Sequence, residues 1–226
     1  MRPKWIPLLA VHNLVVFSAW AVVPFVAAGT VRWLAGWAYF CSLLLAVALH
    51  GAYVREKSPE LLRRRRRSGG GTKTWDVVWN AVFWPLMAAA PIVAGLAVRA
   101  RARPMPAALW PLGTAMLAAG FAISAWAMVS NPYFEGTVRI QRERAHRTVE
   151  AGPYRLARHP GYLGLILWAL GTPVVLLSIW AILPAAGAAA WVVLRTWLED
   201  ETLKRELAGY ADYARRTRFR LVPGVW

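Results

Sequence analysis

Five long stretches of this chain contain no Asp, Glu, Lys or Arg, and this pattern limits what the chain can fold into. A helix needs roughly 20 apolar residues to cross the hydrocarbon core of a bilayer, and each stretch is long enough. The whole chain is 58% hydrophobic, whereas soluble domains are about 45–50% apolar. We therefore expect an all-α, polytopic integral membrane protein. The uncharged stretches are residues 5–31, 33–54, 77–98, 104–134 and 159–194.

The basic residues predict how these segments are oriented. If the N-terminus is cytosolic and the segments alternate, 22 of the 27 Lys and Arg residues fall on the inner side. Such an asymmetry agrees with the positive-inside rule, and it attributes the net charge of +16 to topology and anionic lipid rather than to nucleic acid. We expect both termini to be cytosolic. The alanine and arginine content and the short length favour a bacterial inner membrane, with the endoplasmic reticulum of a eukaryote as the alternative.

The last uncharged stretch is too long for one ordinary crossing. Its 36 residues would form a straight helix of about 54 Å, against a hydrocarbon thickness of about 30 Å. Gly171, Pro173 and Pro184 offer breaks near its middle. We expect a helical hairpin with its tip near Ser178 to Leu183, which gives five or six membrane segments in total, and a single kinked span is the alternative. The hairpin would bring the polar residues before and after it to the same face.

The polar cluster before the hairpin runs from His146 to Gly164. A residue that precedes proline is pushed out of the helical region, and proline suits the first position of a helix. A helix should therefore begin at Pro160, with His159 at its N-terminal mouth. Such a mouth can receive an anionic or polar ligand group, and the small Gly161 would leave room for it. The alternative is a helix cap with a histidine at the membrane interface.

Two arginines in this cluster, Arg155 and Arg158, could bind a carboxylate or phosphate with two parallel hydrogen bonds. They would share a face if the stretch were helical. The alternative is that both are positive anchors on the inner side of the membrane.

The polar cluster after the hairpin contains two adjacent acids, Glu199 and Asp200. Arg195 and Glu199 have the spacing of an ordinary helix-surface pair, as do Asp200 and Lys204. The plain interpretation is a solvated helix end. Acids are unfavourable near a helix C-terminus, however, so a ligand or an arginine partner is the other interpretation.

Other polar residues within or beside the apolar stretches carry weaker signals. Intramembrane His and Asn residues often have a function, but each alone is more typical of a hydrogen bond between helices. We see no metal-binding pattern, no Ser-His-Asp arrangement and no phosphate-binding loop, so no metal is expected. These intramembrane residues are His12, Asn13, His50 and Asn80. Cys41 is expected to be a small buried hydrophobe, and the loop Arg63 to Arg67 is expected to anchor the chain on anionic lipid.

Together these residues resemble the cofactor motif of isoprenylcysteine carboxyl methyltransferases and related membrane phospholipid methyltransferases. The resemblance covers roughly residues 130–226. Its first part is His146, then Gly152-Pro153-Tyr154, then Arg158-His159-Pro160, Tyr162 and Gly164. Its second part is Arg195, Glu199-Asp200, Leu203, Gly209 and Tyr213, followed by the basic tail with Arg218 and Arg220.

The resemblance implies a membrane enzyme that binds S-adenosylmethionine at the cytosolic face and methylates a lipid-like acceptor. It implies that Glu199 and Arg158 are catalytic. It also implies a division at residue 130, with 1–129 holding the lipid part of the substrate and 130–226 forming the methyltransferase core. No obligate protein partner is inferred beyond the bilayer and a lipid or prenylated substrate. The implied cofactor-binding residues are His146, Gly152, Pro153, Tyr154, His159, Tyr162, Gly164, Glu199 and Asp200.

The acceptor and even the reaction stay open at this point. An isoprenylcysteine carboxylate is favoured, and a phospholipid amine is the nearest alternative. Sterol reductases resemble the same C-terminal region, so a membrane reductase that uses NADPH is a second class. A non-catalytic scaffold or channel is a third.

Overall fold

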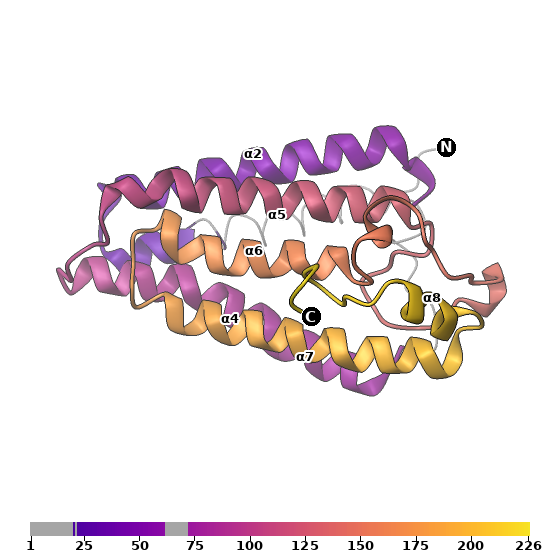
Figure 1. Cartoon of the computed structure of the whole chain (residues 1–226). Coiled ribbons are helices and arrows are strands. Elements are labelled where there is room, and N and C mark those ends of the chain that lie inside the picture. Colours follow the sequence, from indigo (N-terminus) through magenta and orange to yellow (C-terminus); the bar gives the residue numbers. More distant parts are fainter. Residues whose placement is uncertain (1–19, 21, 62–71) are drawn as a thin grey trace, which may run out of the picture.

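The structure is a computed structural model that describes residues 20, 22–61 and 72–226. Helices make up all the regular structure of these ranges, which confirms the expected all-α class (Figure 1). Short 3-10 helices occur at η1 (Ala107–Leu109), η2 (Arg142–Arg144) and η3 (Gly152–Arg155). The α-helices are α2 (Leu34–Lys57), α4 (Thr74–Arg99), α5 (Trp110–Ser130), α6 (Pro160–Val175), α7 (Ile182–Glu206) and α8 (Tyr210–Arg216).

The five long helices lie side by side as a bundle, and α5, α6 and α7 follow one another in alternating directions (Figure 1). Of the described helices, α2, α4 and the segment 107–130 are long and apolar enough to cross a membrane. Helix α6 is shorter, with 16 residues, or about 24 Å. The chain is therefore an integral membrane protein. Whether it has five or six crossings stays a prediction, because most of the stretch 5–31 lies outside the described residues.

The predicted hairpin is confirmed. Helix α6 ends at Val175, α7 begins at Ile182, and the two helices pack along one another. The tip includes Leu177, which has a positive φ of 52° and whose carbonyl oxygen accepts the Met105 N–H at 2.8 Å. Pro184 does not interrupt α7, because it lies in the first turn of this helix. Backbone N–H groups in the first turn have no acceptor within the helix, so proline, which lacks the N–H, is tolerated there.

Glycines hold α5 and α6 together. Gly113 and Gly120 of α5 face Gly171 and Gly164 of α6, and the spacing of seven residues on both helices keeps them on one seam. A methyl group added at Gly120 would lie 2.7 Å from the carbonyl oxygen of Gly164. Small residues allow backbones to approach closely in membranes, where packing rather than water drives association. This seam makes α5 and α6 the central pair of the bundle.

The charges at the two ends of the bundle differ. One end carries the hairpin tip, and Gly29 lies there beside the Arg99 side chain. The other end, which we call the site end, gathers the C-terminal end of α5 and the N-terminal ends of α4 and α6 (Figure 1). Most of the basic residues of the loops and tail lie at the site end. This separation agrees with the predicted orientation.

The polar residues of the apolar stretches have ordinary roles where they are described. Nδ1 of His50 on α2 lies 3.2 Å from the Phe121 carbonyl oxygen on α5, the contact between helices that was expected. Asn80 donates to the Asp76 carbonyl oxygen within α4, at 2.8 Å. The expectation that Cys41 is buried is wrong, because this residue is exposed on the surface of α2. The predictions for His12, Asn13 and the loop Arg63 to Arg67 concern residues outside the described ranges.

We expect Gly120→Ala to lower the melting temperature of the detergent-purified protein. The added methyl group would overpack the seam, which costs about 1–3 kcal/mol. Gly187→Ala on α7 is the control, because its methyl group would meet only the Leu86 side chain, at 3.6 Å. Equal melting temperatures for the two variants would contradict a tight seam.

Candidate active site

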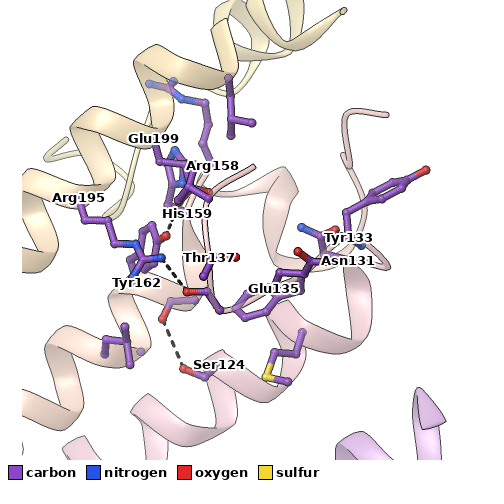
Figure 2. A pocket seen from close by; sticks show the side chains of 18 of the residues that line it. Ser124, Asn131, Tyr133, Glu135, Thr137, Arg158, His159, Tyr162, Arg195 and Glu199 are labelled. Carbon is purple, nitrogen blue, oxygen red and sulfur yellow. Dashed lines mark hydrogen bonds between the residues drawn. The ribbon is translucent and has the colours of Figure 1, made fainter. Parts of the chain in front are cut away.

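A cavity of about 340 Å³ opens at the site end between α4, α5, α6, α7 and the loop that follows α5 (Figure 2). Its wall changes in character along its length. The part between the helices is aromatic, and the part beneath the loop is charged. The aromatic part includes Phe83, Trp84, Phe121 and Trp168. The charged part includes Glu135, Arg139, Arg158, Arg195 and Glu199, with the imidazoles of His146 and His159 beside them.

The start of α6 is fixed by the C-terminal tail. The helix begins at Pro160 with His159 as its N-cap residue, as predicted. The backbone N–H groups of Arg158 and His159 donate to the carbonyl oxygens of Phe219 and Arg220, at 3.0 and 2.9 Å. The imidazole of His159 is buried and stacks on Tyr162, with ring centroids 5.7 Å apart. Both rings therefore face the cavity from a backbone that cannot shift freely.

Asp200 is the centre of a buried polar cluster behind the cavity wall. Its side chain is 0% exposed, and Arg158 binds it with two parallel hydrogen bonds, Nε to Oδ1 at 2.7 Å and Nη2 to Oδ2 at 3.0 Å. Because two carboxylate oxygens have about four acceptor positions, this carboxylate has no capacity left for a ligand. Its other contacts are His159 Nε2 at 3.3 Å, Tyr210 OH at 3.0 Å, Lys204 Nζ at 2.9 Å and Arg220 Nε at 2.9 Å.

The remaining donors of Arg158 hold the tail. Its Nη1 donates to the carbonyl oxygens of Thr217 and Arg218, at 2.7 and 2.9 Å. Arg155 is exposed at the end of η3, so the two arginines are not brought together. Arg158 therefore joins α6, α7 and the tail.

The two adjacent acids do different things. The expectation that they lie at a helix end is wrong, because α7 continues to Glu206. Neighbouring residues on a helix point about 100° apart, so Asp200 faces the buried cluster while Glu199 faces the cavity. Glu199 accepts a hydrogen bond from the Tyr162 hydroxyl (Figure 2). Among the described residues, the hydroxyl of Tyr162 is therefore the hydrogen-bond partner of the Glu199 carboxylate, which has the cavity beside it.

Arg195 does not form the expected surface pair with Glu199. It is buried, and its Nη2 lies 2.8 Å from Oδ1 of Asp76 on α4. The guanidinium lies over the ring of Trp79, 4.0 Å from the centroid. Its Nε has no hydrogen-bond acceptor within the described residues. The sequence reasoning missed Asp76, although it is the charge that immediately precedes the uncharged stretch 77–98.

His146 lies in the loop after α5 and faces the cavity. Its ring stacks on Tyr133, with centroids 4.3 Å apart, and its Nδ1 faces the Gln141 N–H at 3.4 Å. Burial lowers the pKa of His146, and the positive charge of Arg144 lowers that pKa further. Both effects favour the neutral form of the imidazole.

The predicted cofactor residues divide into two groups, and their binding roles stay predictions. Gly164 belongs both to the cavity wall and to the glycine seam. Gly152 has a positive φ of 59° and, with Pro153, shapes the turn η3 beside the wall. The cavity-lining group is His146, Tyr154, His159, Tyr162, Gly164 and Glu199, and the group behind it is Gly152, Pro153 and Asp200.

Asp200→Asn should strongly destabilise the protein. Removing one partner from a buried ion cluster costs about 3–5 kcal/mol, since Arg158 would keep a buried charge without a counter-ion. We expect a large fall in melting temperature, measured in detergent. Asp212→Asn is the control, because Asp212 pairs with Arg215 on the exposed surface of α8, and it should melt like the wild type. A similar melting temperature for both variants would argue against the buried cluster.

Known proteins are similar to this chain in the region that builds the cavity. Residues 112–205 match the isoprenylcysteine carboxyl methyltransferase (ICMT) family. A probable protein-S-isoprenylcysteine O-methyltransferase of Oryza sativa subsp. indica is 33% identical over 113 residues, which are 46% of this chain and 56% of the relative. Protein-S-isoprenylcysteine O-methyltransferase B of Arabidopsis thaliana is 35% identical over 85 residues, 37% of this chain and 43% of the relative.

A shorter match, 42% identical over 45 residues, links the chain to the protein-S-isoprenylcysteine O-methyltransferase of Saccharomyces cerevisiae, covering 20% of this chain and 19% of the relative. The chain spans about half the length of the curated relatives that it matches. The matching residues run from α5 through α6 into α7, and these helices build much of the cavity wall. Residues 112–205 of this membrane protein are therefore similar to the isoprenylcysteine carboxyl methyltransferase family.

Proposed function

We propose that this protein transfers a methyl group from S-adenosylmethionine to the carboxylate of an isoprenylated cysteine. The observation that carries the proposal is the single cavity that joins charged groups under the loop to aromatic groups between the helices. A polar methyl donor and an acceptor with an apolar tail need such neighbouring surroundings. The family match supports the same reaction and argues against the reductase and scaffold alternatives.

The residues of the charged part fit the methyl donor. S-adenosylmethionine carries an ammonium group and ribose hydroxyls, and Glu199 offers these groups a carboxylate at the cavity wall. Tyr154 and Tyr162 offer aromatic rings, which suit an adenine or a sulfonium cation. When bound, the cofactor supplies an electrophilic methyl group. We propose that Glu199, Tyr162 and His159 hold it, and that His146 encloses it from the loop.

The residues of the protein also fit a carboxylate acceptor. A carboxylate is already an anion, so it needs positioning rather than a base. Arg195 lines the cavity, and we propose that its guanidinium aligns the acceptor carboxylate. Phe121, Trp84 and Trp168 would then contact the apolar tail. This arrangement keeps residues 1–129 as the lipid-binding part, since α2, α4 and α5 supply most of that wall.

The last two points concern Arg158 and the alternative amine acceptor. Because its donors are engaged by Asp200 and the tail, we propose a positioning role for Arg158 rather than contact with the substrate. An amine acceptor, as in phospholipid N-methylation, would also need a group to take a proton, and Glu199 is the carboxylate placed for that.

Calorimetric titration with S-adenosylhomocysteine tests the cofactor assignment, with NADPH as the parallel ligand. We expect the homocysteine compound to bind and NADPH not to bind. Glu199→Gln should weaken the affinity about 10-fold or more, because a hydrogen bond to a charged group contributes about 1.5–3 kcal/mol. Glu201→Gln is the matched control, because Glu201 pairs with Lys204 and is not part of the cavity wall. Binding of NADPH alone would overturn the proposal.

The proposed location is the inner membrane of a bacterium, with the site end in the cytosol. A protease-cleavable tag placed after Trp226 should be cut by added protease in inverted vesicles and should be protected in spheroplasts. A tag inserted after Arg101, at the other end of the bundle, should show the opposite pattern. Cleavage of the Trp226 tag from outside the cell would reverse the orientation and place the cofactor site on the wrong side.

A further inference from the structure

A buried acid from the N-terminal half of the chain reaches into the candidate active site. Asp76 lies in the first turn of α4, outside the family match at residues 112–205, and its side chain is 0% exposed. Its Oδ1 lies 2.8 Å from Nη2 of Arg195. Its Oδ2 accepts the backbone N–H of Val138 at 2.9 Å. One carboxylate therefore contacts α7 and the loop over the cavity at the same time.

Arg195 is held from several directions by this contact and its neighbours. Trp79, one turn after Asp76 on α4, lies beneath the guanidinium at 4.0 Å. Nη2 of Arg195 also donates to the Gly136 carbonyl oxygen at 3.1 Å (Figure 2). Helix α4 thus supplies both the counter-ion and the surface on which Arg195 rests, and the loop supplies an acceptor.

Trp79 is itself immobilised. Its indole N–H donates to the Trp191 carbonyl oxygen at 2.7 Å, and the indole N–H of Trp191 donates to the Trp79 carbonyl oxygen at 3.1 Å. These reciprocal bonds join α4 to α7 one turn before Arg195. The ring beneath the guanidinium therefore cannot move without separating two helices.

The pair of Asp76 and Arg195 is poorly explained by stability alone. Replacing a buried ion pair by apolar residues is often neutral or stabilising. Here Oδ1 of Asp76 and Nε of Arg195 also have no hydrogen-bond partner within the described ranges. The 2.8 Å contact between Nη2 of Arg195 and Oδ1 of Asp76 is an ion pair without hydrogen-bond geometry. A costly and unsaturated pair on a cavity-lining arginine indicates a role in the site.

We infer that Asp76 is a positioning residue for methyl transfer. It holds the cavity-lining Arg195 against Trp79, in the orientation proposed for the acceptor. Through Val138 it also fixes the loop segment 136–138, which lines the cavity. This inference rests on the proposed function in one respect, namely that Arg195 aligns the carboxylate of the acceptor. It assigns part of the catalytic arrangement to the half of the chain expected only to hold lipid.

Kinetics with N-acetyl-S-farnesylcysteine as the acceptor test the contact with Arg195. Asp76→Asn should raise KM for the acceptor or lower kcat, with a combined loss on the order of 100-fold, as expected for a reacting group displaced by about 1 Å. The affinity for S-adenosylhomocysteine should change less than threefold. Asp76→Glu keeps the charge and should lose less activity, and it serves if Asp76→Asn does not fold.

Glu206→Gln is the matched control for these measurements. Glu206 also joins α7 to the start of α4, through Lys73 at 2.6 Å, but it is partly exposed and does not contact Arg195. It should leave the kinetics near wild type. An equal loss in Glu206→Gln, or equal losses of acceptor kinetics and cofactor affinity in Asp76→Asn, would reduce Asp76 to an ordinary contact between helices and overturn the inference.

Hydrogen exchange of the ligand-free protein tests the contact with Val138 and does not depend on the acceptor. The double variant Asp76→Leu with Arg195→Met removes both charges and should stay folded. We expect exchange in a peptide spanning residues 134–140 to become at least 10-fold faster while α5 and α6 stay protected. Unchanged protection would overturn the inference. Wild-type protein that binds S-adenosylhomocysteine but does not methylate the farnesylcysteine would refute the proposed acceptor, and the exchange result would still decide the role of Asp76.

Discussion

The candidate site depends on one buried carboxylate, Asp200. Within a single ion cluster it binds the residue before the N-cap of α6, the next turn of its own helix and the C-terminal tail. The start of α6 and the tail are distant from Asp200 in sequence, and both are held by charges that are costly to leave unpaired beside a buried carboxylate. The positions of His159 and Tyr162 follow from this cluster, since both rings project from the short segment that it fixes. The carboxylate therefore acts on the cavity without lining it.

Much of the fold follows from the sequence because the signals are local. Long uncharged stretches set the helices, and Pro160 sets the start of α6 through its missing N–H and fixed φ. The hairpin followed from length, since a helix of 36 residues does not match a bilayer. The seam of Gly113, Gly120, Gly164 and Gly171 was harder to find, because its register depends on which faces of α5 and α6 meet. Which face of α5 packs against which face of α6 cannot be predicted from the sequence of either helix.

The site was predictable where a motif marks it and obscure where it depends on contacts between distant elements. In the sequence, Glu199 and Asp200 look like one acidic pair. Neighbouring side chains on a helix point about 100° apart, so Glu199 faces the cavity and Asp200 faces the buried cluster. Arg195 was expected on a helix surface, and it is buried because Asp76 meets it from α4. A lone acid at the edge of an apolar stretch looks like a helix end in a sequence. Only the packing of α4 against α7 shows that Asp76 pairs with Arg195.

The glycine seam has a consequence for how the cavity of such a protein can change its shape. Gly120 and Gly164 belong both to the contact between α5 and α6 and to the wall of the cavity. A larger side chain at either position would spread the helices and narrow the cavity together, so the two effects cannot be selected separately. Trp84 and Phe121 line the cavity but lie outside the seam. A change in the shape of the cavity is therefore directed to these aromatic positions, while the backbone spacing between α5 and α6 stays fixed.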